Sequence, residues 1–148
     1  MVYSEVWSSE VLMIDSYKGY QYCIMSYGHH PCCYVSIHEG HPALVFDDSE
    51  YWKIPVSCHG GITFFDKGLR KAVDVDLLGS NEWVIGWDYA HCDDFSGTYI
   101  KKNSKTVNHL ETRLFGDTKK WSTKALIKEC MNVIDQLYLL EHPEVLYA

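Results

Sequence analysis

The chain has 148 residues, of which 47% are hydrophobic and 14% aromatic, which is the length and apolar content of one ordinary domain with a buried core. Thirteen Lys and Arg against 20 Asp and Glu give a formal net charge of −7, which disfavours a surface built to bind duplex nucleic acid. The N-terminus lacks the pattern of a secretory signal, and no stretch is long enough to cross a bilayer. We therefore expect a single domain, residues 1–148, in the cytosol, with no membrane partner and with its six cysteines reduced.

The first two thirds of the chain is predicted to be rich in strands. Turn residues at 28–31 (GHHP) separate the first two strand candidates and predict a hairpin. A weaker candidate at residues 51–58 contains Pro55, which limits it to an edge or a strand end. Residues 66–81 and the polar residues 95–120 are predicted to be mostly loop. The β-prone segments are residues 19–27, 32–37, 61–65 and 82–87.

The last predicted element is an amphipathic helix that begins after Ser122, a good N-cap residue, and is stopped by Pro143. Its apolar positions recur at helical spacing, and charged and polar residues occupy the opposite face. The apolar positions are Leu126, Ile127, Cys130, Val133, Ile134, Leu137 and Tyr138. The predicted fold class is therefore α+β, with a small antiparallel or mixed β-sheet and a long C-terminal helix packed on it.

A histidine and two glycines precede the third strand candidate, at His59, Gly60 and Gly61. Successive glycines allow positive φ angles, and consecutive backbone amides in such a turn can form an anion-binding nest with the histidine at its lip. The alternative is an ordinary turn at a strand start, in which the histidine bonds to a backbone carbonyl.

Polar side chains also follow the fourth strand candidate, where Asp88, His91 and Asp94 are spaced three residues apart. One helical turn would align them, so that a carboxylate orients the imidazole for proton transfer or all three ligate zinc or manganese. The alternative is a polar loop whose carboxylates cap the next turn. Because both motifs end strands and carry polar groups, we expect side-chain atoms of His59 to lie within roughly 8 Å of those of His91 or Asp88.

The remaining histidines and cysteines give weaker signals. In HEGHP, the flanking Gly40 and Pro42 and a spacing of three exclude the metalloprotease helix motif, although His38 or His41 could point into a shared site. A zinc site built from Cys33, Cys58, Cys92 and a histidine, or a nucleophilic Cys58 or Cys92 beside a histidine, has no supporting spacing. We expect the protein to fold without stoichiometric metal, and the sequence identifies no cofactor.

The succession CCYVSIHEGHP, VSCHGGITFF and WVIGWDYAHCDD, followed by a C-terminal helix, resembles a family of small uncharacterised proteins encoded by tailed bacteriophages. The resemblance covers residues 19–94 and the last helix; Trp87 stands where that family more often has phenylalanine, and the polar segment after Asp94 does not align. It implies a phage accessory protein in the host cytosol. The matching polar residues are His41, His59, Thr63, Asp88, His91 and Asp94, together with Gly60 and Gly61.

Three classes of function remain open. In the first, His59, His91, Asp88 and Asp94 are the acid/base groups of a small hydrolase. In the second, the protein captures a small anionic, nucleotide-like ligand such as a host immune signal, held by Gly60, Gly61, His41, Thr63 and a stacking Trp87. In the third, an aromatic surface inhibits a host defence protein, and the His and Asp residues are structural. The convergence of glycines, histidines and carboxylates at two strand ends favours a small-ligand site.

Overall fold

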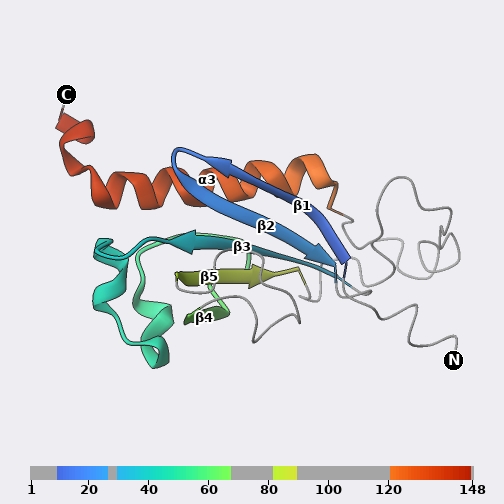
Figure 1. The fold of residues 1–148 in the computed structure, drawn as a ribbon, viewed down its shortest axis with the longest axis horizontal. Coiled ribbons are helices and arrows are strands. Elements are labelled where there is room, and N and C mark those ends of the chain that lie inside the picture. The colour runs from blue at the N-terminus through green and yellow to red at the C-terminus, as the bar shows by residue number, and fades with distance from the viewer. Residues whose placement is uncertain (1–9, 27–29, 68–81, 90–120, 148) are drawn as a thin grey trace, which may run out of the picture.

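The computed structural model describes residues 10–26, 30–67, 82–89 and 121–147, and shows a five-stranded antiparallel sheet with a C-terminal helix packed against it (Figure 1). The spatial order of the strands is β1-β2-β3-β5-β4. The predicted α+β class is confirmed. The strands are β1 (Glu10–Tyr17), β2 (Tyr20–Ser26), β3 (Pro31–Ile37), β4 (Phe64–Lys67) and β5 (Trp83–Asp88), and the helix is α3 (Thr123–Glu141). Three short 3-10 helices are η1 (Pro42–Val45), η2 (Asp48–Lys53) and η3 (Pro143–Tyr147).

Helix α3 begins and ends where its sequence predicts. The Ser122 hydroxyl accepts a hydrogen bond from the Ala125 amide at 3.1 Å, which satisfies one of the unpaired amides of the first turn. The helix ends at Glu141, and its C-cap residue His142 directly precedes Pro143, which cannot continue the helix. Its buried positions are Leu126, Cys130, Val133, Ile134 and Leu137. Among the described residues, no helix is long and apolar enough to span a membrane.

The structure corrects the predicted strands in two places. Strand β1 was not predicted; a register shift between Val11 and Met13 interrupts the alternation of side chains that marks a strand in sequence. Residues 51–58 do not form a strand, because η2 occupies residues 48–53 and irregular backbone follows it. The Asp47 carboxylate caps η2 by accepting from the Ser49 amide at 3.1 Å.

A two-residue turn joins β1 to β2. Lys18 and Gly19 have φ angles of 50° and 83°, and two successive positive values are the signature of the turn whose twist matches an antiparallel hairpin. The Lys18 ammonium lies 2.8 Å from the Asp135 carboxylate of α3, so the hairpin tip also contacts the helix.

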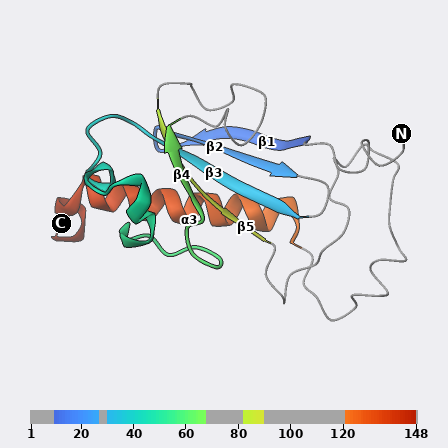
Figure 2. The same ribbon diagram turned by 90° about the horizontal axis from the view of Figure 1, so that it is seen from below.

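Alternate side chains divide the sheet into two faces. The face under α3 contains the main hydrophobic core, in which Ile24, Val35 and Ile85 from the three central strands pack with the buried side of the helix. Figure 2, viewed from below, shows α3 running along one side of the sheet. Removing one such side chain from water contributes about 1.5–3 kcal/mol, so this face supplies most of the apolar stabilisation.

The opposite face carries a smaller cluster made of Cys23, Met25, Cys32, Tyr34 and Val84. Gly86 of β5 pairs with Tyr34 of β3, and the tyrosine ring lies over the glycine. A Cβ atom at Gly86 would stand 2.5 Å from Cδ1 of Tyr34 and 3.0 Å from the Cys33 carbonyl oxygen. A glycine is therefore required here by close packing and not by its φ angle.

Candidate functional site

A pocket of about 410 Å³ lies between η2 and the segment that leads into β4. Trp52 stands at this pocket with 68% of its surface exposed, which is a large apolar area for one side chain to leave in water. The lining residues are Tyr51, Trp52, Ile54, Val56, Gly60, Gly61, Ile62 and Thr63, which include three of the predicted ligand-binding residues.

The two glycines form a tight turn at the rim of this pocket. Gly60 and Gly61 have φ angles of 69° and 84°, and the Gly61 amide donates to the Cys58 carbonyl oxygen at 3.0 Å. The His59 amide donates to the Glu129 carboxylate at 3.0 Å. Two of the amides that an anion-binding nest would use are therefore occupied, and a carboxylate lies against the turn.

Helix α3 holds the start of this segment in place. Gln136 accepts from the Ser57 amide at 2.7 Å and donates to the Ser57 carbonyl oxygen at 2.8 Å, so its side chain pairs with the backbone as a strand would. Glu129, seven residues earlier on the same side of the helix, binds the His59 amide. The pocket rim is thus supported by a rigid element.

The His59 ring is packed between aromatic side chains. It stacks on Tyr89 with ring centres 4.6 Å apart and an angle of 8° between the planes, and Trp121 contacts it edge-on at 4.9 Å. Tyr89 is fully buried, and burial raises the pKa of its phenol. Because Tyr89 directly follows β5, this stack brings the glycine turn and the end of β5 together.

Thr63 and Asp88 also meet at this point. The Thr63 hydroxyl donates to the Asp88 carboxylate at 3.2 Å, and the Thr63 amide donates to the Gly86 carbonyl oxygen at 2.9 Å. The two strand ends thus share a polar contact between two predicted site residues. His91 and Asp94 lie outside the residues that the structure describes, as does Cys92.

Two other predicted ligand-binding residues lie in the interior. His41 is 2% exposed; its Nδ1 accepts from the Ala43 amide at 3.0 Å, so its Nε2 donates to the Leu137 carbonyl oxygen at 2.9 Å. It caps η1 and ties it to α3, and burial lowers its pKa. Trp87 is 1% exposed on the helix face, and its indole donates to the Tyr89 hydroxyl at 3.1 Å. Neither side chain is open to a ligand in this structure.

A polar cluster that the sequence did not predict lies where α3 ends. The Glu141 carboxylate binds His38 and accepts from the Tyr20 hydroxyl at 3.0 Å. Burial opposes ionisation of Glu141, but the hydrogen bonds from His38 and Tyr20 hold its pKa below the ordinary value. His38 and Glu141 are 103 positions apart, so no local motif could have revealed the pair.

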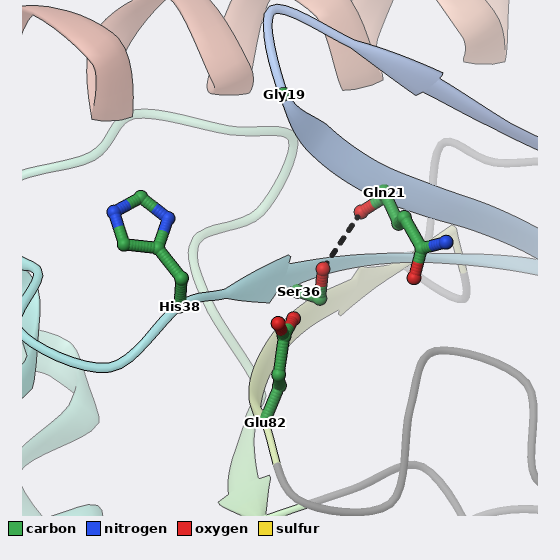
Figure 3. A pocket seen from close by; sticks show the side chains of 5 residues that line it. All are labelled: Gly19, Gln21, Ser36, His38 and Glu82. Atoms are coloured by element: carbon green, nitrogen blue, oxygen red, sulfur yellow. Dashed lines mark hydrogen bonds between the residues drawn. The ribbon is translucent and has the colours of Figure 1, made fainter.

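His38 also stands at the edge of a second pocket, of about 330 Å³ (Figure 3). The pocket is lined by Gly19, Gln21, Ser36, His38 and Glu82.

In the described part of the chain, no group of three or more His, Cys, Asp or Glu side chains is arranged to hold a metal ion. Residues Cys23, Cys32, Cys33, Cys58 and Cys130 are free thiols.

Acidic residues precede the pocket residues Tyr51 and Trp52 along η2. Helix η2 begins at Asp48, whose pKa is raised by its hydrogen bond to Asp47 and by the nearby charges of Asp47 and Asp66. The described cation on the same element is Lys53, whose ammonium lies 5.2 Å from the Trp52 ring centre and 2.5 Å from the Glu50 carboxylate.

Comparisons with protein-family models, curated proteins and solved structures find no match to this chain.

Proposed function

We propose that the protein is a small-molecule-binding module that captures a nucleoside-like ligand in the pocket between Trp52 and the turn at Gly60 and Gly61. The observation that carries this proposal is the exposed face of Trp52 beside a pocket of about 410 Å³. A planar base that covers the indole would remove apolar surface from water, and base–aromatic stacking contributes about 1–3 kcal/mol per base.

The polar groups around this pocket suit a sugar better than a chain of phosphates. Thr63 and Asp88 supply a hydroxyl and a carboxylate that can accept from ribose hydroxyl groups, while the amides of His59 and Gly61 are already bonded within the protein. Asp47 and Asp48 stand at the start of the short helix that carries Trp52, and their charges disfavour a highly anionic ligand. A single phosphate could pair with Lys53 if Glu50 released it.

Capture is favoured over turnover by the packing of His59. Its ring is stacked on Tyr89 and contacted by Trp121, so aromatic packing accounts for its position in the described part of the site. The alternative is a hydrolase, in which His59 would act together with His91, Asp88 or Asp94. In a phage-infected cell, a module of this kind would act by withdrawing a nucleotide-like host signal from solution.

Isothermal titration calorimetry with nucleosides and their mono- and triphosphates tests the proposal. We expect nucleosides or monophosphates to bind, triphosphates to bind more weakly, and Trp52→Ala to weaken binding by about 5- to 100-fold through loss of the stack. Val45→Ala is the matched control, because Val45 is 79% exposed in the neighbouring η1 and does not line the pocket. Equal affinity of the Trp52→Ala and wild-type proteins would refute the site.

Mass analysis of the bound compound separates capture from hydrolysis. The ligand is incubated with the protein, the protein is denatured by heat, and the mass of the released compound is measured by mass spectrometry. Recovery of the intact ligand supports capture, and recovery of a cleaved product would instead establish an enzyme.

A second function is favoured by one observation, the exposure of two large apolar side chains on consecutive short helices. Val45 and Trp52 are 79% and 68% exposed, and such surface is characteristic of protein contacts. If the protein inhibits a host defence protein, both Val45→Ala and Trp52→Ala should weaken that complex, whereas only Trp52→Ala affects capture of a nucleoside.

A further inference from the structure

We propose that the pocket lined by Gly19, Gln21, Ser36, His38 and Glu82 is a second ligand site, which binds the ammonium group of a small organic amine. It lies on the sheet surface away from the pocket at Trp52 and shares no lining residue with it. The inference therefore does not depend on the function proposed above.

Three elements of the sheet form this pocket. Ser36 is in β3 between Val35 and Ile37, which face the helix, so its own side chain points to the opposite face. Glu82 directly precedes β5, and Gln21 is in β2, so the two flank Ser36 from neighbouring strands. Figure 3 shows the Ser36 hydroxyl and the Glu82 carboxylate pointing toward the same space, with the Gln21 side chain next to them.

The polar atoms in this space are mainly hydrogen-bond acceptors. Ser36 is 3% exposed, and its hydroxyl donates to the Gln21 carbonyl oxygen at 3.5 Å, so the oxygen lone pairs remain for a donor. The Glu82 carboxylate and the amide oxygen of the Gln21 side chain add further acceptors. An ammonium group has three N–H donors and no acceptor, which matches this set.

The charge of Glu82 is not neutralised within the described part of the chain, where its side chain makes no hydrogen bond or ion pair. Lys18, the cation nearest in sequence to the pocket lining, is held on α3, with its ammonium 2.8 Å from the Asp135 carboxylate and 5.0 Å from the Tyr138 ring centre. His38 is bound to Glu141. A half-buried carboxylate that has no partner among the described residues favours a cationic ligand, because desolvating it alone is costly.

The ligand is limited in size by the pocket. A volume of about 330 Å³ is at the lower end of the range for small-molecule sites, and His38 stands at its edge. We therefore expect a short alkyl chain to follow the ammonium group toward His38, as in n-butylamine.

Two-dimensional ¹⁵N–¹H NMR titration of the full chain tests this site. We expect n-butylamine to shift the amide signals of Gln21, Ser36 and Glu82, and the isosteric n-butanol and butyrate to leave them unchanged. Glu82→Gln should weaken amine binding by about 10- to 100-fold, since the amide oxygen can still accept a hydrogen bond but the charge that strengthens it is lost. The amide spectrum of that variant shows whether the fold is retained.

Glu39→Gln is the matched control, because it removes the same charge from an exposed turn that does not line the pocket. Its amine affinity should equal that of the wild type. Binding of butyrate or butanol as tightly as the amine would refute the proposal, as would shifts confined to other residues or equal weakening by Glu39→Gln and Glu82→Gln.

Discussion

The two faces of the sheet differ in what they bury. The face under α3 packs branched aliphatic and aromatic side chains from the central strands against five buried positions of the helix. The opposite face has a smaller buried cluster, with cysteine, methionine and tyrosine, and the polar residues Ser36 and Glu82 next to it. The comparison indicates that stability comes mainly from the first face and that the second can carry polar chemistry without weakening the core.

The largest effect is expected from the helix face. Ile134→Ala removes a fully buried side chain and should lower the free energy of unfolding by about 2–5 kcal/mol, from lost burial and the cavity left behind. Ile14→Ala is the control, because Ile14 pairs with Cys23 on the other face and is 48% exposed; its cost should be under about 1 kcal/mol. Urea unfolding of both variants measures the difference. Similar losses of unfolding free energy in the two variants would contradict the view that the helix face supplies most of the stability.

A smaller effect is expected on the opposite face, at the contact between Gly86 and Tyr34. Gly86→Ala places a Cβ against the tyrosine ring and should destabilise the protein by about 1–3 kcal/mol. The same substitution in a Tyr34→Ala background should cost clearly less, because the ring is gone and only the contact with the Cys33 carbonyl remains. Additive losses in this double-mutant cycle would show that the ring is not what excludes a side chain.

His41 should give a moderate effect that depends on pH. His41→Asn keeps an acceptor for the Ala43 amide but cannot reach the Leu137 carbonyl, so we expect a loss of about 0.5–1.5 kcal/mol at neutral pH. Burial lowers the His41 pKa in the folded state below the ordinary value of 6.5. The unfolded chain therefore takes up a proton as the pH falls through 6.5 while the folded chain resists it.

The stability that neutral His41 contributes to the folded state is complete above pH 6.5. It declines as the pH falls from there toward the folded-state pKa of His41. The variant should lack that part of the pH dependence. Glu141 also has a lowered pKa, from an ordinary value of 4.5, so its contribution is lost in a more acidic window. Urea unfolding at several pH values separates the two, and an unchanged slope near pH 6 in His41→Asn would contradict the assignment.

The smallest effect is expected at the hairpin tip. Asp135→Asn removes the ion pair with Lys18, whose side chains are 40% and 44% exposed, and should cost no more than about 1 kcal/mol. Because salt screens such pairs, the difference from the wild type should shrink in concentrated sodium chloride. A loss that is large and insensitive to salt would mean that the Tyr17 hydroxyl, which donates to Asp135 at 3.0 Å, contributes more than the ion pair.

Helix α3 was predictable because local signals agree: Ser122 caps it, apolar residues recur at helical spacing, and Pro143 follows it. Strand β1 was missed because its bulge hides the alternation on which a strand prediction depends. Trp87 was predicted to bind a ligand. It is two residues after Ile85 in the same strand, so both side chains lie on the same face of the sheet, which is the face that forms the core. The alternation of residues 83–88 would have predicted its burial.

The candidate site was predictable only in part. Gly60, Gly61 and Thr63 stand out in the sequence because a glycine pair at a strand start is a local signal. Trp52 was not singled out, since nothing in residues 51–58 indicates which side chains the fold leaves exposed. The support of the turn by Glu129 and Gln136 and the pairing of His38 with Glu141 join residues 70 or more positions apart, and such contacts follow from the tertiary fold alone.

The order of the strands in the sheet determines the order in which they can pair during synthesis. Strands β1, β2 and β3 are consecutive along the chain and adjacent in the sheet, so each can pair as soon as it leaves the ribosome. Strand β4 is made next, yet its neighbour in the described sheet is β5, which is synthesised later and pairs with β3 on its other side. The helix that covers the main core is made after all five strands. During synthesis the apolar face of the early meander therefore stays uncovered until α3 emerges, and exposed apolar surface of this kind favours aggregation of the nascent chain.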